Sequence, residues 1–113
     1  MPNLLFICSK NQWRSPTAEL LFKNHLIHSA KSAGTSDKAR IKVNQKIIAW
    51  ADLVFVMERK HMQILKQNFP LGIASKPIIN LDIEDNYQFN APELIDILKA
   101  SLHNYYSRQT LLG

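Results

Sequence analysis

The hydrophobic pattern of the chain alternates between short apolar runs and longer segments in which apolar residues recur at helical spacing. The first run, residues 3–7 (NLLFI), is bounded by polar residues and is typical of a buried strand. Pro16 follows at a position that the first turn of a helix tolerates, and apolar side chains then recur at helical spacing through about His28. The chain therefore begins with a strand, a loop and a helix.

This alternation continues beyond the first helix. The stretch SAGTS predicts a turn around Gly34, and residues 30–32 before it are a candidate for a brief second strand. Residues 43–50 predict a short helix. Residues 53–57 (LVFVM) predict a buried strand, because they are rich in β-branched and aromatic residues.

The C-terminal half repeats the order of strand and helix. Residues 58–68 predict a helix, ended by the Pro-Leu-Gly stretch that follows. Residues 78–81 (IINL) are the last strand candidate, and residues 109–113 are expected to form a frayed tail. Between them, Pro92 opens a final helix with one apolar face, made by Leu94, Ile95, Leu98 and Leu102.

Strands that alternate with helices predict an α/β fold in three layers, with about four parallel strands and helices on both faces of the sheet. The 113 residues suit a single domain over 1–113. In such sheets ligands gather beyond the carboxyl ends of the strands. Cys8 follows the first strand and is therefore expected at that edge.

Composition narrows the class of protein. Hydrophobic residues make up 46% and charged residues 20% of the chain, which is ordinary for a soluble protein. No apolar run approaches the roughly 20 residues that span a bilayer, so no membrane partner is expected. The N-terminal sequence MPNLLFICSK lacks the pattern of a secretory signal, which favours a cytoplasmic location.

The net charge of +5 is unevenly distributed. Five of the nine acidic residues lie in one segment, so the rest of the chain is strongly basic and favours anionic ligands. No basic block with interleaved aromatic residues is present, which argues against a nucleic-acid partner. The five clustered acidic residues are Asp82, Glu84, Asp85, Glu93 and Asp96.

The stretch from Cys8 to Arg14 carries the candidate chemistry. Cys8 is the only cysteine, so the chain can form neither an internal disulfide nor a cysteine-rich metal site. A five-residue loop from a strand end into a helix N-terminus can turn its backbone N–H groups around one tetrahedral anion, and Arg14 can close the ring with its planar fork of donors. The predicted phosphate-binding loop is Ser9, Lys10, Asn11, Gln12, Trp13 and Arg14.

The same donors act on the thiol. Backbone dipoles, a helix N-terminus and a guanidinium all favour the thiolate, which would make Cys8 a nucleophile at neutral pH. Ser15 can donate a hydrogen bond to the sulfur, and the Asn11 side chain can brace the loop. The alternative is an inert thiol, because free cysteine is among the most buried residue types.

The stretch ICSKNQWRSPTAE, with its CX5R spacing, resembles the phosphate-binding loop of the low-molecular-weight protein tyrosine phosphatases. SAGTS at 32–36 is similar to the turn after the second strand of that family, and ADLVFVMERKHMQIL at 51–65 resembles its central strand and the helix that follows. The resemblance implies a phosphotyrosine phosphatase I-like fold with strand order 2-1-3-4. It also implies a reaction without metal or organic cofactor.

The resemblance implies a second carboxyl residue that protonates the leaving oxygen after Cys8 attacks phosphorus. The family usually carries this acid in an Asp-Pro pair after the last strand, and no proline follows either aspartate of LDIEDNYQF at 81–89. Asp85 is the expected acid and Asp82 the second candidate, with a solvated acidic loop as the alternative. Tyr87 and Trp13 are expected at the substrate rim, although either can instead pack on a neighbour or cover the edge.

Two positions depart from the family pattern. Lys10 stands where a glycine is usual, which fits only if its φ is negative, and its ammonium would assist anion binding. Trp13 stands where many relatives have a second cysteine, so no protective disulfide can form within the chain.

The resemblance leaves several functions open. The first is a phosphatase that acts on a phosphorylated protein or a small aryl phosphate, with phosphate or sulfate also binding in the loop. The alternatives are an arsenate reductase that uses an external thiol, a cysteine phosphocarrier, and a catalytically silent phosphate-binding or regulatory protein. No metal site is expected, since neither His61 nor the pair His25 and His28 has a further ligand at helical spacing.

Overall fold

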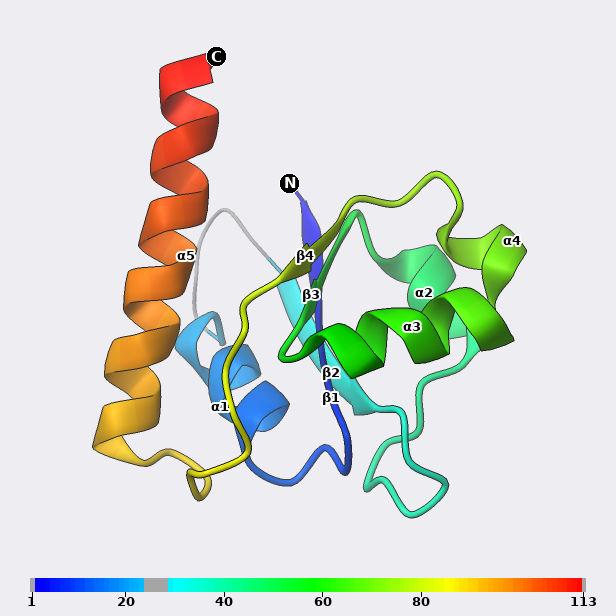
Figure 1. Cartoon of the computed structure of the whole chain (residues 1–113), viewed down its shortest axis with the longest axis horizontal. Coiled ribbons are helices and arrows are strands. Elements are labelled where there is room, and N and C mark those ends of the chain that lie inside the picture. The colour runs from blue at the N-terminus through cyan, green and yellow to red at the C-terminus, as the bar shows by residue number, and fades with distance from the viewer. Residues whose placement is uncertain (1, 24–28, 113) are drawn as a thin grey trace.

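Four parallel strands form one sheet in the order β2-β1-β3-β4 (Figure 1). The computed structural model describes residues 2–23 and 29–112. This order and the all-parallel pairing confirm the predicted sheet. The strands are β1 (Asn3–Cys8), β2 (Ser29–Gly34), β3 (Leu53–Val56) and β4 (Ile78–Asn80).

Strand β1 is buried on both faces, which explains its unbroken apolar sequence. Successive side chains point to opposite sides of a strand. Leu4, Phe6 and Cys8 accordingly pack in one hydrophobic cluster, whereas Leu5 and Ile7 pack in the other. The nucleophile candidate therefore belongs to the strand at the centre of the molecule.

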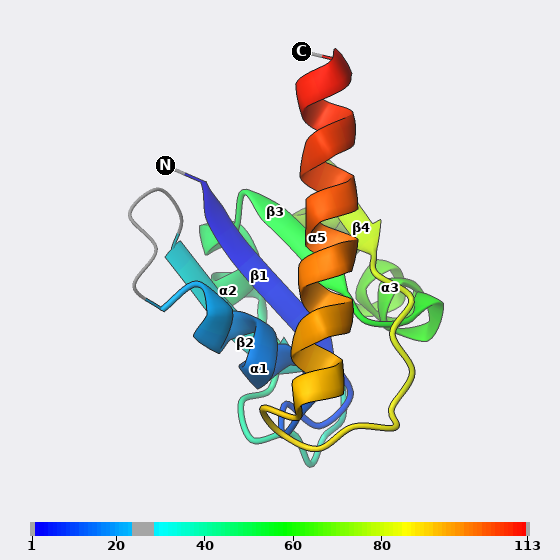
Figure 2. The ribbon, with the colours of Figure 1, turned by 90° about the vertical axis from the view of Figure 1, so that its left-hand side faces the viewer.

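Helices cover both faces of the sheet and complete the predicted three layers (Figures 1 and 2). On the face toward Cys8 lie α1 (Arg14–Leu21) and α5 (Pro92–Leu112). On the other face lie α2 (Gln45–Trp50), α3 (Arg59–Asn68) and α4 (Pro70–Ile73).

The end of the first helix and the C-terminal tail were predicted wrongly, and the short helix after Asn68 was not predicted. Helix α1 ends at Leu21, because Phe22 turns back to stack on Phe6 with the ring centroids 5.7 Å apart. The rest of the predicted first helix, with His25 and His28, lies outside the described residues. Pro70 begins the short α4, where proline fits the first helical position. The predicted tail is helical instead, since α5 continues through Leu112.

The carboxyl ends of the strands meet at one edge of the sheet. Cys8 is paired in register with Gly34, and Ile7 lies beside Val56, which in turn lies beside Asn80. The loops that follow β1, β2, β3 and β4 therefore converge there. None of the helices in the described part of the chain combines the length and apolar character that crossing a bilayer requires.

Candidate active site

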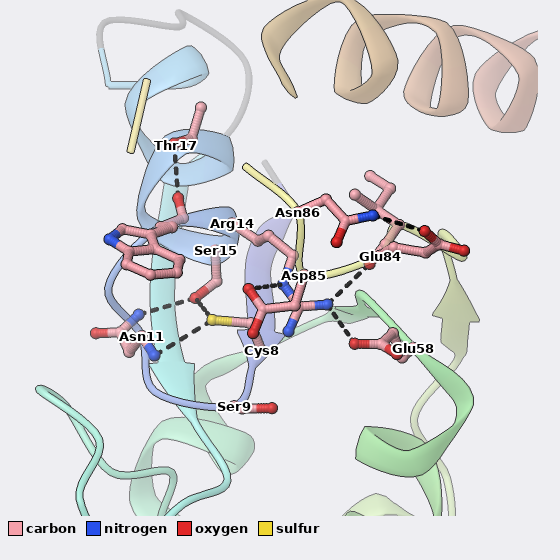
Figure 3. Close-up of polar contacts among 12 residues, drawn as sticks. Cys8, Ser9, Asn11, Arg14, Ser15, Thr17, Glu58, Glu84, Asp85 and Asn86 are labelled. Carbon is pink, nitrogen blue, oxygen red and sulfur yellow. Dashed lines mark hydrogen bonds and ion pairs between the residues drawn. The ribbon is translucent and has the colours of Figure 1, made fainter. Parts of the chain in front are cut away.

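The loop between β1 and α1 curls around the sulfur of Cys8 (Figure 3). The backbone N–H of Asn11 donates to Cys8 Sγ at 3.2 Å, and Asn11 has a φ of 56°. Asparagine tolerates this left-handed conformation better than most residues. Lys10 is not among the described residues with positive φ, so the lysine fits where the related family has glycine.

The Asn11 side chain joins the loop to the sheet. It is fully buried, and its Nδ2 donates to Ser15 Oγ and to Ser32 Oγ, each at 2.9 Å. Ser32 Oγ in turn donates to Glu19 Oε1. Because these partners come from α1 and β2, the strained residue is fixed from two elements at once.

Cys8 Sγ receives a second hydrogen bond. The Ser15 hydroxyl lies 2.9 Å from the sulfur and accepts a hydrogen from Asn11 Nδ2, and its own hydrogen can go to Cys8 Sγ or to the more distant Ala33 oxygen at 3.4 Å. The Ser15 hydroxyl and the Asn11 N–H are thus both within hydrogen-bonding distance of the sulfur. The Cys8 residue is only 3% exposed and belongs to a hydrophobic cluster, but it also lines a cavity.

Arg14 begins α1, and its guanidinium is anchored beside the sulfur. Nη1 donates to Glu58 Oε1 at 2.5 Å and to the backbone oxygen of Ile83 at 2.8 Å, and the residue is 2% exposed. Nε lies 3.6 Å from Asp85 Oδ1. Nη1 carries both anchoring bonds, and Nη2 has no hydrogen-bond partner among the described residues, so its hydrogens can be donated to an anion.

Glu58 is a site residue that sequence analysis assigned only to a helix. Burial would raise the pKa of Glu58, but the hydrogen bond and charge of Arg14, together with Lys60, outweigh it and hold this pKa below its usual value. Glu58 therefore stays ionised beside the guanidinium. Its position directly after the end of a parallel strand was the available signal, because such residues converge at one edge.

His61 links the cap of α3 to the phosphate-binding loop. Its Nδ1 accepts the backbone N–H of Glu58 at 3.0 Å, so the ring hydrogen is on Nε2 and is donated to Ser9 Oγ at 2.9 Å. Burial and the charge of Arg14 lower the pKa of His61 to about 4. Among the described residues, no group of three or more His, Cys, Asp and Glu side chains is arranged to hold a metal ion.

A cavity of about 80 Å³ lies over the sulfur. Asp85 belongs to its lining and faces Arg14 (Figure 3), whereas Asp82 is exposed and outside it. Tyr87 packs on the hydrophobic cluster beneath α5 and does not line the cavity. The lining residues are Cys8, Lys10, Gln12, Trp13, Arg14 and Asp85.

The segment after β2 supports the loop from outside. Backbone N–H groups of Ser36 and Arg40 donate to the oxygens of Ser9 and Lys10, each at 2.9 Å. Arg40 Nε donates to the Asn11 oxygen at 3.0 Å. These bonds use the outward carbonyl groups of the loop, which leaves its N–H groups free to face inward.

Comparison with known proteins finds matches among solved structures. No protein-family model and no curated protein matches the sequence. The alignment with a low-molecular-weight protein tyrosine phosphatase from Streptococcus pyogenes covers 96% of this chain and 93% of that one, at 18% identity and a TM-score of 0.73. The tyrosine phosphatase Wzb from Escherichia coli K30 aligns over 96% and 99% of the two chains, at 19% identity and a TM-score of 0.74.

The chain has the fold of the low-molecular-weight tyrosine phosphatases. The same fold is found in the YwlE arginine phosphatase from Geobacillus stearothermophilus, which aligns over 100% of this chain and 97% of that one, at 20% identity and a TM-score of 0.70. The expected phosphotyrosine phosphatase I-like architecture is therefore confirmed. In this phosphatase fold, the loop from Cys8 to Arg14 occupies the carboxyl edge of the sheet.

Proposed function

We propose that this chain is a cysteine-dependent phosphatase that hydrolyses phosphotyrosine or small aryl phosphate monoesters through a phosphocysteine intermediate. The observation that carries the proposal is the convergence of Cys8, Arg14 and Asp85 on one small cavity. Solved structures of this fold support it, since they include tyrosine phosphatases, one of them in complex with phosphate and another with benzylphosphonate.

The first half of the reaction transfers the phosphoryl group to sulfur. Arg14 and the inward N–H groups of the loop bind the equatorial oxygens of the substrate, and Cys8 Sγ attacks phosphorus in line. The bond between phosphorus and the ester oxygen breaks as the bond to sulfur forms. Asp85 gives its proton to the departing oxygen, which leaves as an alcohol or phenol.

The second half regenerates the enzyme. Asp85, now a carboxylate, takes a proton from water as that water attacks the phosphocysteine. Inorganic phosphate is released, and the sulfur leaves as a thiolate that Ser15 and the Asn11 N–H stabilise. No metal or organic cofactor is needed for this cycle, because the loop donors neutralise the phosphoryl charge.

Three substitutions test the proposal. Purified wild type is expected to hydrolyse p-nitrophenyl phosphate and a phosphotyrosine peptide, and Cys8→Ser is expected to abolish turnover while phosphate binding persists. Asp85→Asn is expected to lower kcat by about 10²-fold or more, the usual effect of losing a general acid. The loss is expected to be larger for phenyl phosphate than for p-nitrophenyl phosphate, because the poorer leaving group depends more on protonation.

Asp82→Asn is the matched control, since it removes one carboxylate from the same loop outside the cavity. If Asp82→Asn alone produced the leaving-group dependence, the assignment of Asp85 would be wrong. Binding of phosphate without any turnover would favour a silent binding protein. Reduction of arsenate with an added thiol, in the absence of phosphate release, would favour the reductase.

A further inference from the structure

The mouth of the Cys8 cavity carries opposite charges on its two sides. Asp85 lies on the side of the loop after β4, where its carboxylate faces the Arg14 guanidinium. Lys10 lines the cavity from the phosphate-binding loop and is exposed to solvent, and its neighbour Asn11 lies on the other side of the sulfur from Asp85 (Figure 3). A ligand that enters the cavity passes between an acidic and a basic side chain.

The ammonium of Lys10 has no partner within the described part of the chain. No ion pair or side-chain hydrogen bond is found for Lys10 there, whereas Asp85 and Glu58 are both paired with Arg14. The backbone of Lys10 is nevertheless fixed, because its oxygen accepts the Arg40 N–H at 2.9 Å. Lys10 therefore presents an uncompensated cation from a rigid position.

Neighbouring segments extend this charge separation. The segment that packs on the loop beside Lys10, residues 36–42, carries three cations and one anion, and that anion, Asp37, is paired with Lys42. On the opposite side, residues 82–85 carry three carboxylates and no cation. The field across the mouth therefore favours a substrate that carries negative charge on the Lys10 side.

We propose that Lys10 is a specificity-determining residue that selects phosphorylated peptides with a carboxylate directly beside the phosphorylated residue. This inference rests on the proposed phosphatase function. When Arg14 holds the phosphoryl group of a bound peptide, the residues before and after the phosphorylated residue lie at the mouth of the cavity. One of these two neighbours then lies on the side of Lys10. A carboxylate on that flank meets an unpaired ammonium, and a cation there is repelled.

The test uses phosphotyrosine peptides of one length that carry Glu, Gln or Lys immediately before or immediately after the phosphotyrosine. Wild type is expected to show, for one of the two placements, a kcat/KM about two- to fivefold higher with Glu than with Gln, the range of an exposed charge pair. Lys at that placement is expected to lower kcat/KM. The preference is expected to shrink as NaCl rises, because salt screens exposed charges.

Variants of Lys10 assign the preference to this side chain. Lys10→Gln is expected to bring the Glu to Gln ratio close to one, and Lys10→Glu to invert it. The ratio between peptides cancels any general loss of activity. Lys66→Gln is the matched control and is expected to keep the wild-type ratio, since Lys66 lies in the last turn of α3, at the end of the helix away from Glu58.

The outcomes separate the two proposals. If wild type hydrolysed no aryl phosphate, the phosphatase function itself would fail. If wild type hydrolysed all peptides but showed the same kcat/KM with Glu, Gln and Lys, only the role of Lys10 would be overturned. A Lys10→Gln variant that lowered kcat/KM equally for every peptide would also overturn it, because the lysine would then act only on the phosphate.

Discussion

His61 connects two parts of the site through one imidazole ring. It accepts the backbone N–H of Glu58 at Nδ1 and donates from Nε2 to Ser9, and the bond at Nδ1 needs the neutral ring, because a protonated Nδ1 cannot accept. Burial and the nearby Arg14 charge lower the pKa of His61 to about 4, compared with an ordinary value of 6.5. The fold therefore selects the uncharged form of this histidine.

This shift predicts a pH dependence of stability. Between pH 6.5 and about 4 the unfolded chain binds a proton at His61 that the native chain does not, so the free energy of unfolding falls as pH falls through this window. The loss from this group is on the order of 3 kcal/mol by pH 4, and the full contribution is present above pH 6.5. Urea denaturation at several pH values measures it.

His61→Gln is expected to remove this component of the pH dependence. His103→Gln is the control, because His103 is an exposed histidine on α5, and it is expected to keep the wild-type dependence. An identical slope of unfolding free energy against pH in wild type and His61→Gln would contradict the role assigned to the buried ring.

For single residues, the sequence predicts a role correctly where that role depends on residues nearby in the chain. Cys8 and Arg14 belong to one short loop between a strand and a helix, so their proximity followed from the order of the chain. Glu58 reaches Arg14 across 44 positions, and its contact exists only because two loops meet at one sheet edge. The sequence pattern placed Glu58 near this edge of the sheet, but it gave no distance between the Glu58 and Arg14 side chains.

Gly34 shows how an element positions the site. It ends β2 beside Cys8, and a Cβ at this position would lie 2.4 Å from the Ser9 oxygen and 3.0 Å from the Asn11 nitrogen. Both neighbours are backbone atoms of the phosphate-binding loop, which cannot move without disturbing the cavity. Only glycine lets the second strand approach the loop this closely.

Gly34→Ala is therefore expected to weaken phosphate binding at least tenfold and to lower the free energy of unfolding by about 1–3 kcal/mol, the usual cost of overpacking. Isothermal titration with phosphate and urea denaturation measure the two effects. Gly72→Ala is the control, because Gly72 lies in helix α4 and its Cβ would meet Ile48 Cγ2 of α2 at 3.6 Å, an ordinary van der Waals contact. A Gly34→Ala protein with wild-type phosphate affinity would contradict this account.

The elements themselves were largely predictable. The parallel sheet and the α/β class follow from the alternation of apolar runs with helical spacing. The errors lie where one residue type serves two purposes. Pro70 ends α3 and also begins α4, and the apolar Phe22 continues the helical spacing while belonging to a turn that stacks on Phe6.

The whole molecule has a net charge of +5, and Cys8 and Arg14 line a small cavity. A ligand that binds the native state but not the unfolded chain stabilises the protein by mass action, by about 2.7 kcal/mol at a concentration of 100 Kd. Phosphate at that concentration is expected to raise the Tm by on the order of 10 °C. Thermal unfolding in phosphate, against chloride of equal ionic strength, measures the rise.

Arg14→Lys is expected to lose most of this rise, because an ammonium lacks the planar fork that holds two phosphate oxygens. Lys66→Gln removes one positive charge at a position away from the cavity, and this variant is expected to show the wild-type rise in Tm. An equal rise in all three proteins would show that phosphate acts on the general charge of the molecule and not on the cavity.

The anchoring of Arg14 has a consequence for chain synthesis. The cysteine and the arginine are six positions apart, yet the guanidinium is held by Glu58 and by the carbonyl oxygen of Ile83, which is 69 positions further along. A ribosome-bound or truncated chain that stops before β4 contains every residue of the loop but lacks the last anchor. The guanidinium should therefore reach its final position beside the sulfur only once the chain is nearly finished.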